Sequence, residues 1–241
     1  MLHKTRGIVL HSIKYSETSL IVKTYTEAFG LQSYMLKGIR SQKAKTSPAL
    51  FQPLTLLELV VYHKEKTSLH PVKEVRLAIP THSTSSDIRK SSIALFLAEL
   101  LYRTIREEEA NLQLFNFLWS SFIQLDKTDE HVAHFHLLFS MKLCAFLGFQ
   151  PQENRNEYNR FFHLREGSFH PLFTSPDDSL DEAQSACFYQ LLTTEMEQLS
   201  LLSFSPATRS EMLDKILRYY RHHLSGFGEI RSREVLHTVL S

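Results

Sequence analysis

Four cations stand close together near residue 40 and could neutralise a run of negative charges. Within nine residues of the chain these cations are Lys37, Arg40, Lys43 and Lys45, and Gly38 lies among them. Cations so close repel one another unless water or a polyanion lies between them, and phosphates need point charges rather than a shaped pocket. The segment therefore predicts contact with a nucleic-acid backbone. Charge alone leaves a solvated surface turn as the alternative.

The charge of the chain is unevenly divided. Residues 1–80 hold twelve Lys and Arg against five Asp and Glu, a net charge of +7. Residues 81–241 hold fifteen against twenty-one, a net charge of −6, so that the whole chain carries only +1. Such an asymmetry indicates a half that faces nucleic acid, joined to a half with other partners.

The basic half alternates apolar and polar residues as strands do. Strands are predicted over residues 5–13, 19–26, 31–37, 54–62 and 69–78. In the first strand, Ile8 and Leu10 are expected on one face and Val9, His11 and Ile13 on the other. Pro71 interrupts the last strand and favours an edge position for it. Five short strands with a long third connection fit an OB-fold barrel, although an SH3-like barrel gives a similar pattern.

Aromatic residues and cations on strands 2 and 3 of an OB barrel could form a stacking platform inside an electrostatic groove. Tyr34 lies in the third predicted strand and Lys23 in the second. A half-buried structural tyrosine is the alternative for Tyr34. The DNA-binding residues predicted in this way are Lys23, Tyr34, Lys37, Arg40, Lys43 and Lys45.

Beyond a polar linker at residues 80–86 the apolar period changes from two to 3.6. Helices are predicted over residues 87–108, 111–125, 128–147, 179–199, 205–226 and 232–240, with an irregular insert at about 149–178. Ser179 is expected to open a capping box, and Ser205 to cap a helix that begins at Pro206. The predicted fold class is α+β. An OB-fold domain occupies residues 1–80, and an all-α domain with the insert occupies residues 81–241.

Signatures of enzymes and bound nucleotides are missing from the sequence. Its seven glycines form neither a G-x-G-x-x-G nor a Walker A pattern, and there is no G-x-S-x-G elbow. Cys144 and Cys187 are the only cysteines, too few for a disulfide framework or a four-cysteine zinc site. No apolar run is long enough to span a bilayer. We therefore expect a soluble, cytoplasmic protein that is not an enzyme and has no cofactor.

Three histidines close together in the sequence are candidate metal ligands. His131 and His134 are expected three residues apart on one helix face, with His136 off that face. Two imidazoles at this spacing can share an ion, but nothing nearby completes a site. Solvated helix histidines are the favoured interpretation, and no metal site is predicted.

Several stretches, kept in the same order, resemble the RecO family of bacterial recombination mediators. They are YSETSL (15–20), GL (30–31), LKGIR (36–40), LAELL (97–101), FSMKLCAFLGF (139–149) and FHLREGSF (162–169). No single stretch is specific, but the ordered set covers nearly the whole chain. The resemblance implies an N-terminal OB-fold, a helical domain and no turnover chemistry.

The resemblance also implies partners. Members of the family bind single- and double-stranded DNA, anneal complementary strands and help load the recombinase. They act with RecR, RecF and the acidic C-terminal tail of single-strand-binding protein. Many members hold a four-cysteine zinc site in the insert. Residues 150–171 of this chain contain no cysteine, so the insert is expected to fold without metal.

A receptor for such an acidic tail needs an apolar groove between helices with a cation at its mouth. In the acidic helical half, the cations near apolar stripes are Arg103, Arg106 and Lys142. These three residues are predicted to bind the partner peptide, with a salt-bridged surface as the alternative for each.

Two other functions compete with DNA repair. In the first, the protein is an adaptor whose basic barrel binds an acidic protein surface and no nucleic acid. In the second, it is a hydrolase that uses a histidine, which the absence of any nucleophile arrangement disfavours.

Overall fold

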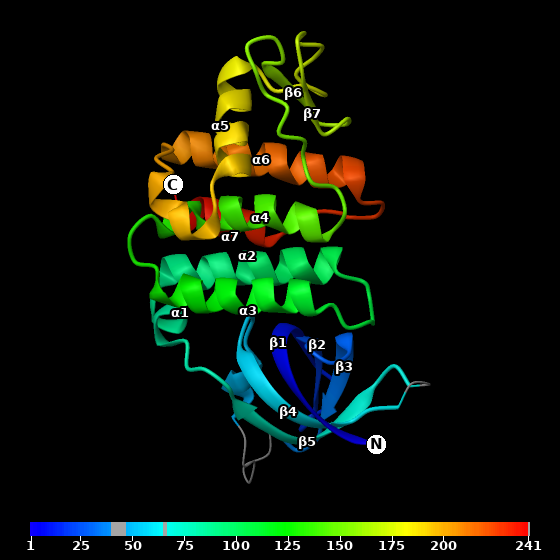
Figure 1. The fold of residues 1–241 in the computed structure, drawn as a ribbon. Helices are drawn as coiled ribbons and strands as arrows, with labels where there is room; N and C mark the ends of the chain where they lie inside the picture. Colours follow the sequence, from blue (N-terminus) through cyan, green and yellow to red (C-terminus); the bar gives the residue numbers. More distant parts are fainter. Residues whose placement is uncertain (40–46, 65–66, 241) are drawn as a thin grey trace. The chain divides into compact units, whose positions relative to one another are not determined.

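The N-terminal strands close into a five-stranded barrel (Figure 1), as seen in a computed structural model that describes residues 1–39, 47–64 and 67–240. The strands are β1 (Leu2–Lys14), β2 (Leu20–Thr26), β3 (Gly30–Leu36), β4 (Leu56–Tyr62) and β5 (His70–Leu77). Their order is β1-β2-β3-β5-β4, and β4 pairs with β1 to close the barrel. Among the strand pairs of the described residues, only β3–β5 is parallel. This is the OB-fold rather than an SH3-like barrel, which confirms the predicted fold class.

A bulge in β1 interrupts the alternation of side chains that the sequence predicts for this strand. The register with β2 shifts between Val9 and His11, so that Leu10 has no partner there. Ile8, Val9 and Leu10 are consequently all buried, while His11 is exposed. The expectation that Val9 and His11 share a face was wrong, because a bulge inserts one extra residue and resets the alternation.

The interior of the barrel is filled by aliphatic side chains, one phenylalanine and one tyrosine. The buried cluster consists of Val9, Val22, Tyr34, Leu36, Ile39, Phe51, Leu57, Leu59 and Val61. Phe51 comes from a short 3₁₀ helix, η1 (Pro48–Phe51), whose N-cap is Ser47. Burying each large side chain contributes about 1.5–3 kcal/mol relative to leaving it exposed. The barrel therefore has its own core.

Three helices complete the first compact unit, which runs from Met1 to Lys127. They are α1 (His82–Ser86), α2 (Ile88–Thr104) and α3 (Leu112–Lys127). The guanidinium of Arg6 in β1 lies over the rings of Phe115 and Trp119 in α3, 5.2 Å and 4.9 Å from their centroids. Tyr25 of β2 stacks on Phe115. Because of these contacts α3 covers part of the outer face of the barrel.

Beyond α2 the chain turns back onto the barrel. The helix ends at Thr104, four residues before the predicted end, and the Glu107 carbonyl accepts a hydrogen bond from the backbone N–H of Leu31. The predicted domain boundary at residue 80 separates strands from helices and stays a prediction. The boundary between the two compact units lies elsewhere, after Lys127.

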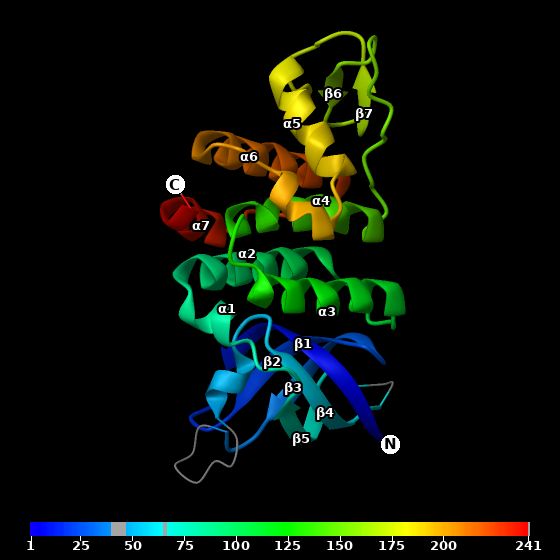
Figure 2. The same cartoon turned by 60° about the vertical axis from the view of Figure 1, so that its left-hand side comes forward.

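The second compact unit begins at Thr128. It contains η2 (Val132–His134), α4 (Phe135–Phe146), β6 (Phe161–His163), β7 (Ser168–His170), α5 (Glu182–Thr193), η3 (Met196–Leu201), α6 (Pro206–His223) and α7 (Ser232–Leu240). Figure 2 shows α5 beside the β6–β7 hairpin. Ser205 caps α6 as predicted. The capping box of α5 instead joins Asp181 and Gln184, because the Ser179 hydroxyl is hydrogen-bonded to that of Thr174.

The helix expected to carry His131 and His134 on one face begins later, although the two rings do lie near each other, with centroids 6.2 Å apart. His131 has a positive φ of 58°, and α4 begins only at Phe135. His134 instead accepts a hydrogen bond from the backbone N–H of Phe204 at 3.0 Å. Among the residues that the structure describes, no group of three or more His, Cys, Asp and Glu side chains could hold a metal ion.

The insert is organised by aromatic side chains and one asparagine. The Asn154 side chain accepts a hydrogen bond from the Phe169 N–H at 2.8 Å and donates one to its carbonyl at 3.0 Å. Phe162 of β6 packs on Phe169 of β7, Phe188 of α5 and Tyr219 of α6. With no cysteine in the segment, its residues do not fit the four-cysteine zinc site that the resemblance implies.

Along the described ranges of the chain, no helix is both long and apolar enough to cross a membrane.

Two glycines with positive φ give a paired test of the barrel. Gly38 has a φ of +70° and no described atom within 4 Å of an added Cβ, so Gly38→Ala should lower the free energy of unfolding by about 1 kcal/mol through strain alone. Gly30→Ala should cost clearly more, because its Cβ would lie 2.2 Å from the Glu109 carbonyl oxygen. Urea denaturation measures both. Equal costs would contradict the close approach of the segment after α2 to the β2–β3 turn.

Candidate nucleic-acid interface

The outer face of β1, β2 and β3 presents two rows of side chains in direct register. One row consists of His11, Lys23 and Ser33, and the other of Ile13, Ile21 and Met35. Ile13 is 47% exposed, and Ile21, Lys23 and Met35 are partly exposed. The strand 2–3 face is where OB-folds bind oligonucleotides. Here it offers an apolar row beside a cation.

Tyr34 does not belong to this face. It lies opposite Val22 on the inner side of the sheet, and its side chain is only 1% exposed. Burial raises the pKa of its phenol to about 12. The prediction placed Lys23 and Tyr34 together, but the register pairs Lys23 with Ser33, so the two side chains point to opposite faces. The Tyr34 ring cannot stack on a base without leaving the core.

Three lysines border the outer face. Lys14 and Lys37 are exposed at the ends of β1 and β3, and Lys23 is half-buried in β2. Over the described part of the chain no ion pair is recorded for any of the three. Of the other predicted cations, Arg40, Lys43 and Lys45 lie outside the described residues.

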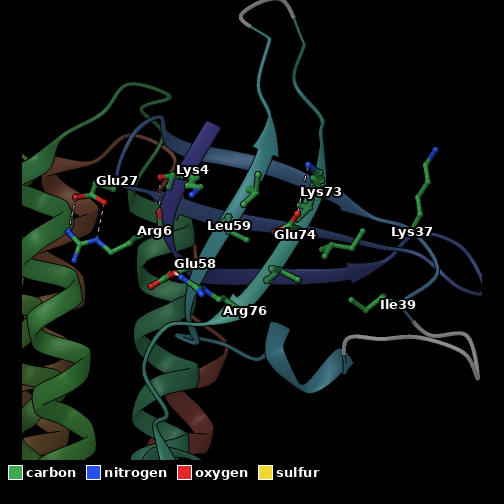
Figure 3. A pocket seen from close by; sticks show the side chains of 15 residues that line it. Lys4, Arg6, Glu27, Lys37, Ile39, Glu58, Leu59, Lys73, Glu74 and Arg76 are labelled. Atoms are coloured by element: carbon green, nitrogen blue, oxygen red, sulfur yellow. Dashed lines mark hydrogen bonds and ion pairs between the residues drawn. The ribbon is translucent and has the colours of Figure 1, made fainter. Parts of the chain in front are cut away.

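A cleft of about 760 Å³ crosses β1, β4 and β5 (Figure 3), but most of its cations are paired. Arg6 donates two hydrogen bonds to Glu27, at 2.9 Å and 2.7 Å. These bonds raise the pKa of Arg6 and lower that of Glu27. Arg76 is paired with Glu58 in the same way, with its Nε 2.6 Å from the carboxylate. The cleft therefore carries alternating charges and attracts a polyanion less than its cations alone would suggest.

Two exposed lysines were missed by the sequence reasoning. Lys4 points outward from β1 at the cleft, and Lys14 ends the same strand. Both lie just outside the predicted first strand, residues 5–13, because the observed strand runs from Leu2 to Lys14. That β1 borders both β2 and β4 follows only from closure of the barrel.

Aromatic rings gather at the β4–β5 connection, which borders the ligand face in many OB-folds. The His63 ring stacks between Phe29 and His70, with centroids 3.9 Å and 4.4 Å away. Burial lowers the pKa of His70, which is 1% exposed. Tyr15, in the β1–β2 turn, is 60% exposed. The rings of His63 and His70 are therefore occupied by packing against each other, while Tyr15 is accessible.

The predicted peptide-binding residues belong to different compact units. In the first unit, Arg103 lies 3.8 Å from Glu99 on α2, and Arg106 is exposed after the helix. Tyr102, the residue before Arg103, is 39% exposed and stacks on His11. In the second unit, the Lys142 amino group donates to the Leu192 carbonyl at 3.1 Å and to Glu195 at 3.0 Å. Lys142 is thus engaged within its own unit.

The fold and the outer face define an OB-fold protein whose barrel face is bordered by lysines and whose strands are followed in the chain by a helical region. Two family models match the chain: "Recombination protein O N terminal" over residues 1–80 and "Recombination protein O C terminal" over residues 85–234. The chain belongs to the RecO family of DNA repair proteins.

Curated relatives named "DNA repair protein RecO" agree with this assignment. The chain is 38% identical to that of Flavobacterium psychrophilum, with 99% of both chains covered, and 39% identical to that of Bacteroides fragilis, with 98% of both covered. The protein of Porphyromonas gingivalis is 30% identical over 99% of both chains. These names describe repair proteins and no enzymatic activity.

The buried phenol of Tyr34 makes stability depend on pH in alkali. Its pKa is about 12 in the folded chain, against an ordinary value near 10, so the folded state holds the proton more tightly. The free energy of unfolding should therefore fall between about pH 10 and 12, by up to about 1.4 kcal/mol per pH unit for this group. Tyr34→Phe should remove that share of the fall, as measured by urea denaturation at several pH values. A variant with the wild-type slope would mean that the phenol is exposed.

Proposed function

We propose that this protein binds single- and double-stranded DNA through the outer face of its barrel. The observation that carries the proposal is the set of three lysines, Lys14, Lys23 and Lys37, which border that face and pair with no carboxylate in the described residues. Phosphates would lie against these amino groups. The row of Ile13, Ile21 and Met35 offers apolar surface to unstacked bases beside them.

The proposal includes the tasks that the family resemblance implies. The protein anneals complementary strands and helps load the recombinase onto DNA coated by single-strand-binding protein, together with RecR and RecF, in the cytoplasm. Membership of a DNA repair family supports this role. Backbone contacts carry no sequence information, and a protein that handles any strand needs this kind of contact.

The competing function is that of an adaptor whose basic barrel binds an acidic protein surface. The apolar row beside Lys23 is compatible with either partner. The two functions differ in salt dependence on DNA, because release of condensed counterions makes the logarithm of the affinity fall linearly with the logarithm of salt concentration. The salt slope measured on a short oligonucleotide therefore separates them.

Lys23→Gln combined with Lys37→Gln tests the outer face. Removing two phosphate contacts should make the salt slope on single-stranded DNA shallower by about 1.4, and should weaken binding to all sequences alike. The matched control is Lys73→Gln with Arg76→Gln, which removes two cations that face Glu74 and Glu58 on the same barrel. The control should change the slope less.

The basic segment at residues 37–45 extends this test. Replacing Lys37, Arg40, Lys43 and Lys45 with Ala should make the slope shallower by roughly 2 to 3 in all if each contacts a phosphate. Circular dichroism checks that each variant folds. If both sets of variants keep the wild-type slope, the barrel does not contact DNA, and the adaptor function is favoured instead.

We further propose that the acidic tail of single-strand-binding protein binds at the end of α2. Leu95 and Tyr102 are 41% and 39% exposed and lie seven residues apart, so they share a helix face. Arg103 follows Tyr102 directly in the sequence, and Arg106 follows the end of the helix. Apolar side chains next to cations suit a short peptide that ends in an apolar residue and a carboxylate. For Lys142 to take part, the tail would have to displace Glu195 from it.

Arg103→Gln with Arg106→Gln should lower the affinity for a tail peptide at least about tenfold, the equivalent of one lost charged hydrogen bond. Lys142→Gln should have a smaller effect. Calorimetry with the full chain and the synthetic peptide measures both. A larger loss in the Lys142 variant would move the peptide site to the second unit.

A further inference from the structure

One edge of β5 has a neighbouring strand over only two residues. β3 pairs with His70 and Pro71 at the start of β5, whereas β4 pairs with the other edge from Val72 to Leu77. In the part of the chain that the structure describes, no strand pairs with the first edge beyond Pro71. This stretch is called the free edge of β5 below. Such an edge presents backbone N–H and C=O groups that can pair with another strand.

Backbone groups in the middle of the free edge point away from β4. The Ala78 N–H donates to the Leu56 carbonyl at 2.9 Å, so these residues form a hydrogen-bonded pair. Hydrogen-bonded and non-hydrogen-bonded pairs alternate along an antiparallel ladder. Glu58 and Arg76 are therefore the next hydrogen-bonded pair, and the N–H and C=O of Val75 are directed to the free edge.

The cleft of about 760 Å³ reaches the free edge (Figure 3), since residues 72–76 of β5 all line it together with the end of β3. Val72 and Val75 pack against the core of the barrel. The side chains of Glu74 and Arg76 are 68% and 78% exposed, so both charges are within reach of a partner. The free edge is thus apolar toward the core and charged toward solvent.

A row of alternating charges crosses the outer face of the barrel and ends at the free edge. Arg6 of β1 lies opposite Glu58 of β4, and Glu58 lies opposite Arg76 of β5. The Arg76 Nε donates to Glu58 at 2.6 Å. Opposite charges on directly opposed residues stabilise a sheet, and like charges destabilise it. A strand added at the free edge is therefore favoured if it places a carboxylate beside Arg76.

The neighbouring row ends in the opposite charge. Lys4 lies opposite Val60, and Val60 lies opposite Glu74 of β5. An added strand is therefore favoured if it also places a cation beside Glu74. Glu74 and Arg76 are two residues apart, which is the spacing of successive side chains on one face of a strand. The sequence of β5 itself, run antiparallel, supplies both charges at this spacing.

We propose that the free edge of β5 binds the same edge of a second copy of this chain. In an antiparallel pair with its two-fold axis at Val75, Glu74 of each copy lies opposite Arg76 of the other. The outward N–H and C=O groups of Val75 then bond those of the second Val75. The contact is isologous and closes at two copies, as in most homodimers. It goes beyond the proposed function, since the dimer forms whether or not the barrel binds DNA.

Charge selects this register over its neighbours. A two-fold axis brings one residue opposite its own copy. An axis at Glu74 would oppose two carboxylates, and an axis at Lys73 or Arg76 would oppose two cations, so each of these registers is disfavoured. Pro71, which has no N–H, and the bulge at Lys73 hinder pairing at the start of β5. The stretch around Val75 remains open to a partner.

The size of the contact sets its strength. A ladder of about five residues buries less than the roughly 1,200 Å² at which standard interfaces begin. The dimer should therefore form only as the protein concentration rises. An extended segment of another protein can pair with an edge strand in the same way. The self-complementary order of Glu74 and Arg76 favours the second copy, because an unrelated segment has no reason to carry both charges at this spacing.

Charge reversal in the full chain tests the pairing. Glu74→Arg alone and Arg76→Glu alone each put like charges across the axis, so each variant should stay monomeric where the wild type dimerises. A mixture of the two variants should dimerise again, because each copy then faces opposite charges on both sides of the axis. The double variant should dimerise for the same reason. Sedimentation equilibrium over a range of concentrations measures the mass, and circular dichroism checks the fold.

The matched controls are Glu17→Arg and Lys127→Glu, which make the same charge changes at exposed positions outside β5 and should dimerise as the wild type does. A wild-type chain that stays monomeric up to its highest soluble concentration overturns the inference. Single variants that dimerise as the wild type does place the contact elsewhere, and the inference fails. A mixture that stays monomeric contradicts the pairing of Glu74 with Arg76. None of these results depends on the salt slopes measured on DNA.

Discussion

Closure of the barrel by β1 is the constraint on which the first unit depends. Its thirteen residues pair with β2 along one edge and with β4 along the other. A strand that must serve both neighbours has to bend, and the bulge at Leu10 supplies the bend by adding one residue to β1 alone. Before the bulge β1 carries Arg6 under α3. After it, the same strand presents Ile13 and Lys14 to solvent beside β2. One strand thus separates the covered part of the outer face from the open part.

The barrel uses its arginines differently from its lysines. Arg6 is held by Glu27 and by two aromatic rings, and Arg76 by Glu58. An arginine can bind a carboxylate through two parallel donors and stack on a ring at once, which suits it to fix neighbouring elements. Exposed pairs of this kind contribute little stability, at most about 1 kcal/mol each. Their main consequence is electrostatic, because they cancel charge across the cleft and leave the positive potential at the lysines.

The sequence predicted the strands well because alternation and turn residues are local signals. It could not predict the bulge at Leu10, which depends on pairing with two strands at once. For the same reason it put Tyr34 on the wrong face, since register decides whether Tyr34 lies opposite Val22 or Lys23. Pro71 was expected at an edge; it instead lies where the short parallel pairing of β3 and β5 stops. In the second unit, His131 adopts a left-handed conformation that helical periodicity gave no reason to expect.

Contacts with α6 explain how an insert with very short strands is held in place. The insert has strands of only three residues, too short to stand alone, so it needs an anchor outside itself. Tyr219 provides it: its ring packs on Phe162, and its hydroxyl donates to the Phe149 carbonyl at 2.6 Å. His223, one turn on, lies 3.0 Å from the Leu164 carbonyl through its Nε2. Arg218, the residue before Tyr219, donates to Asp177 at 2.7 Å and adds an ion pair to this anchor.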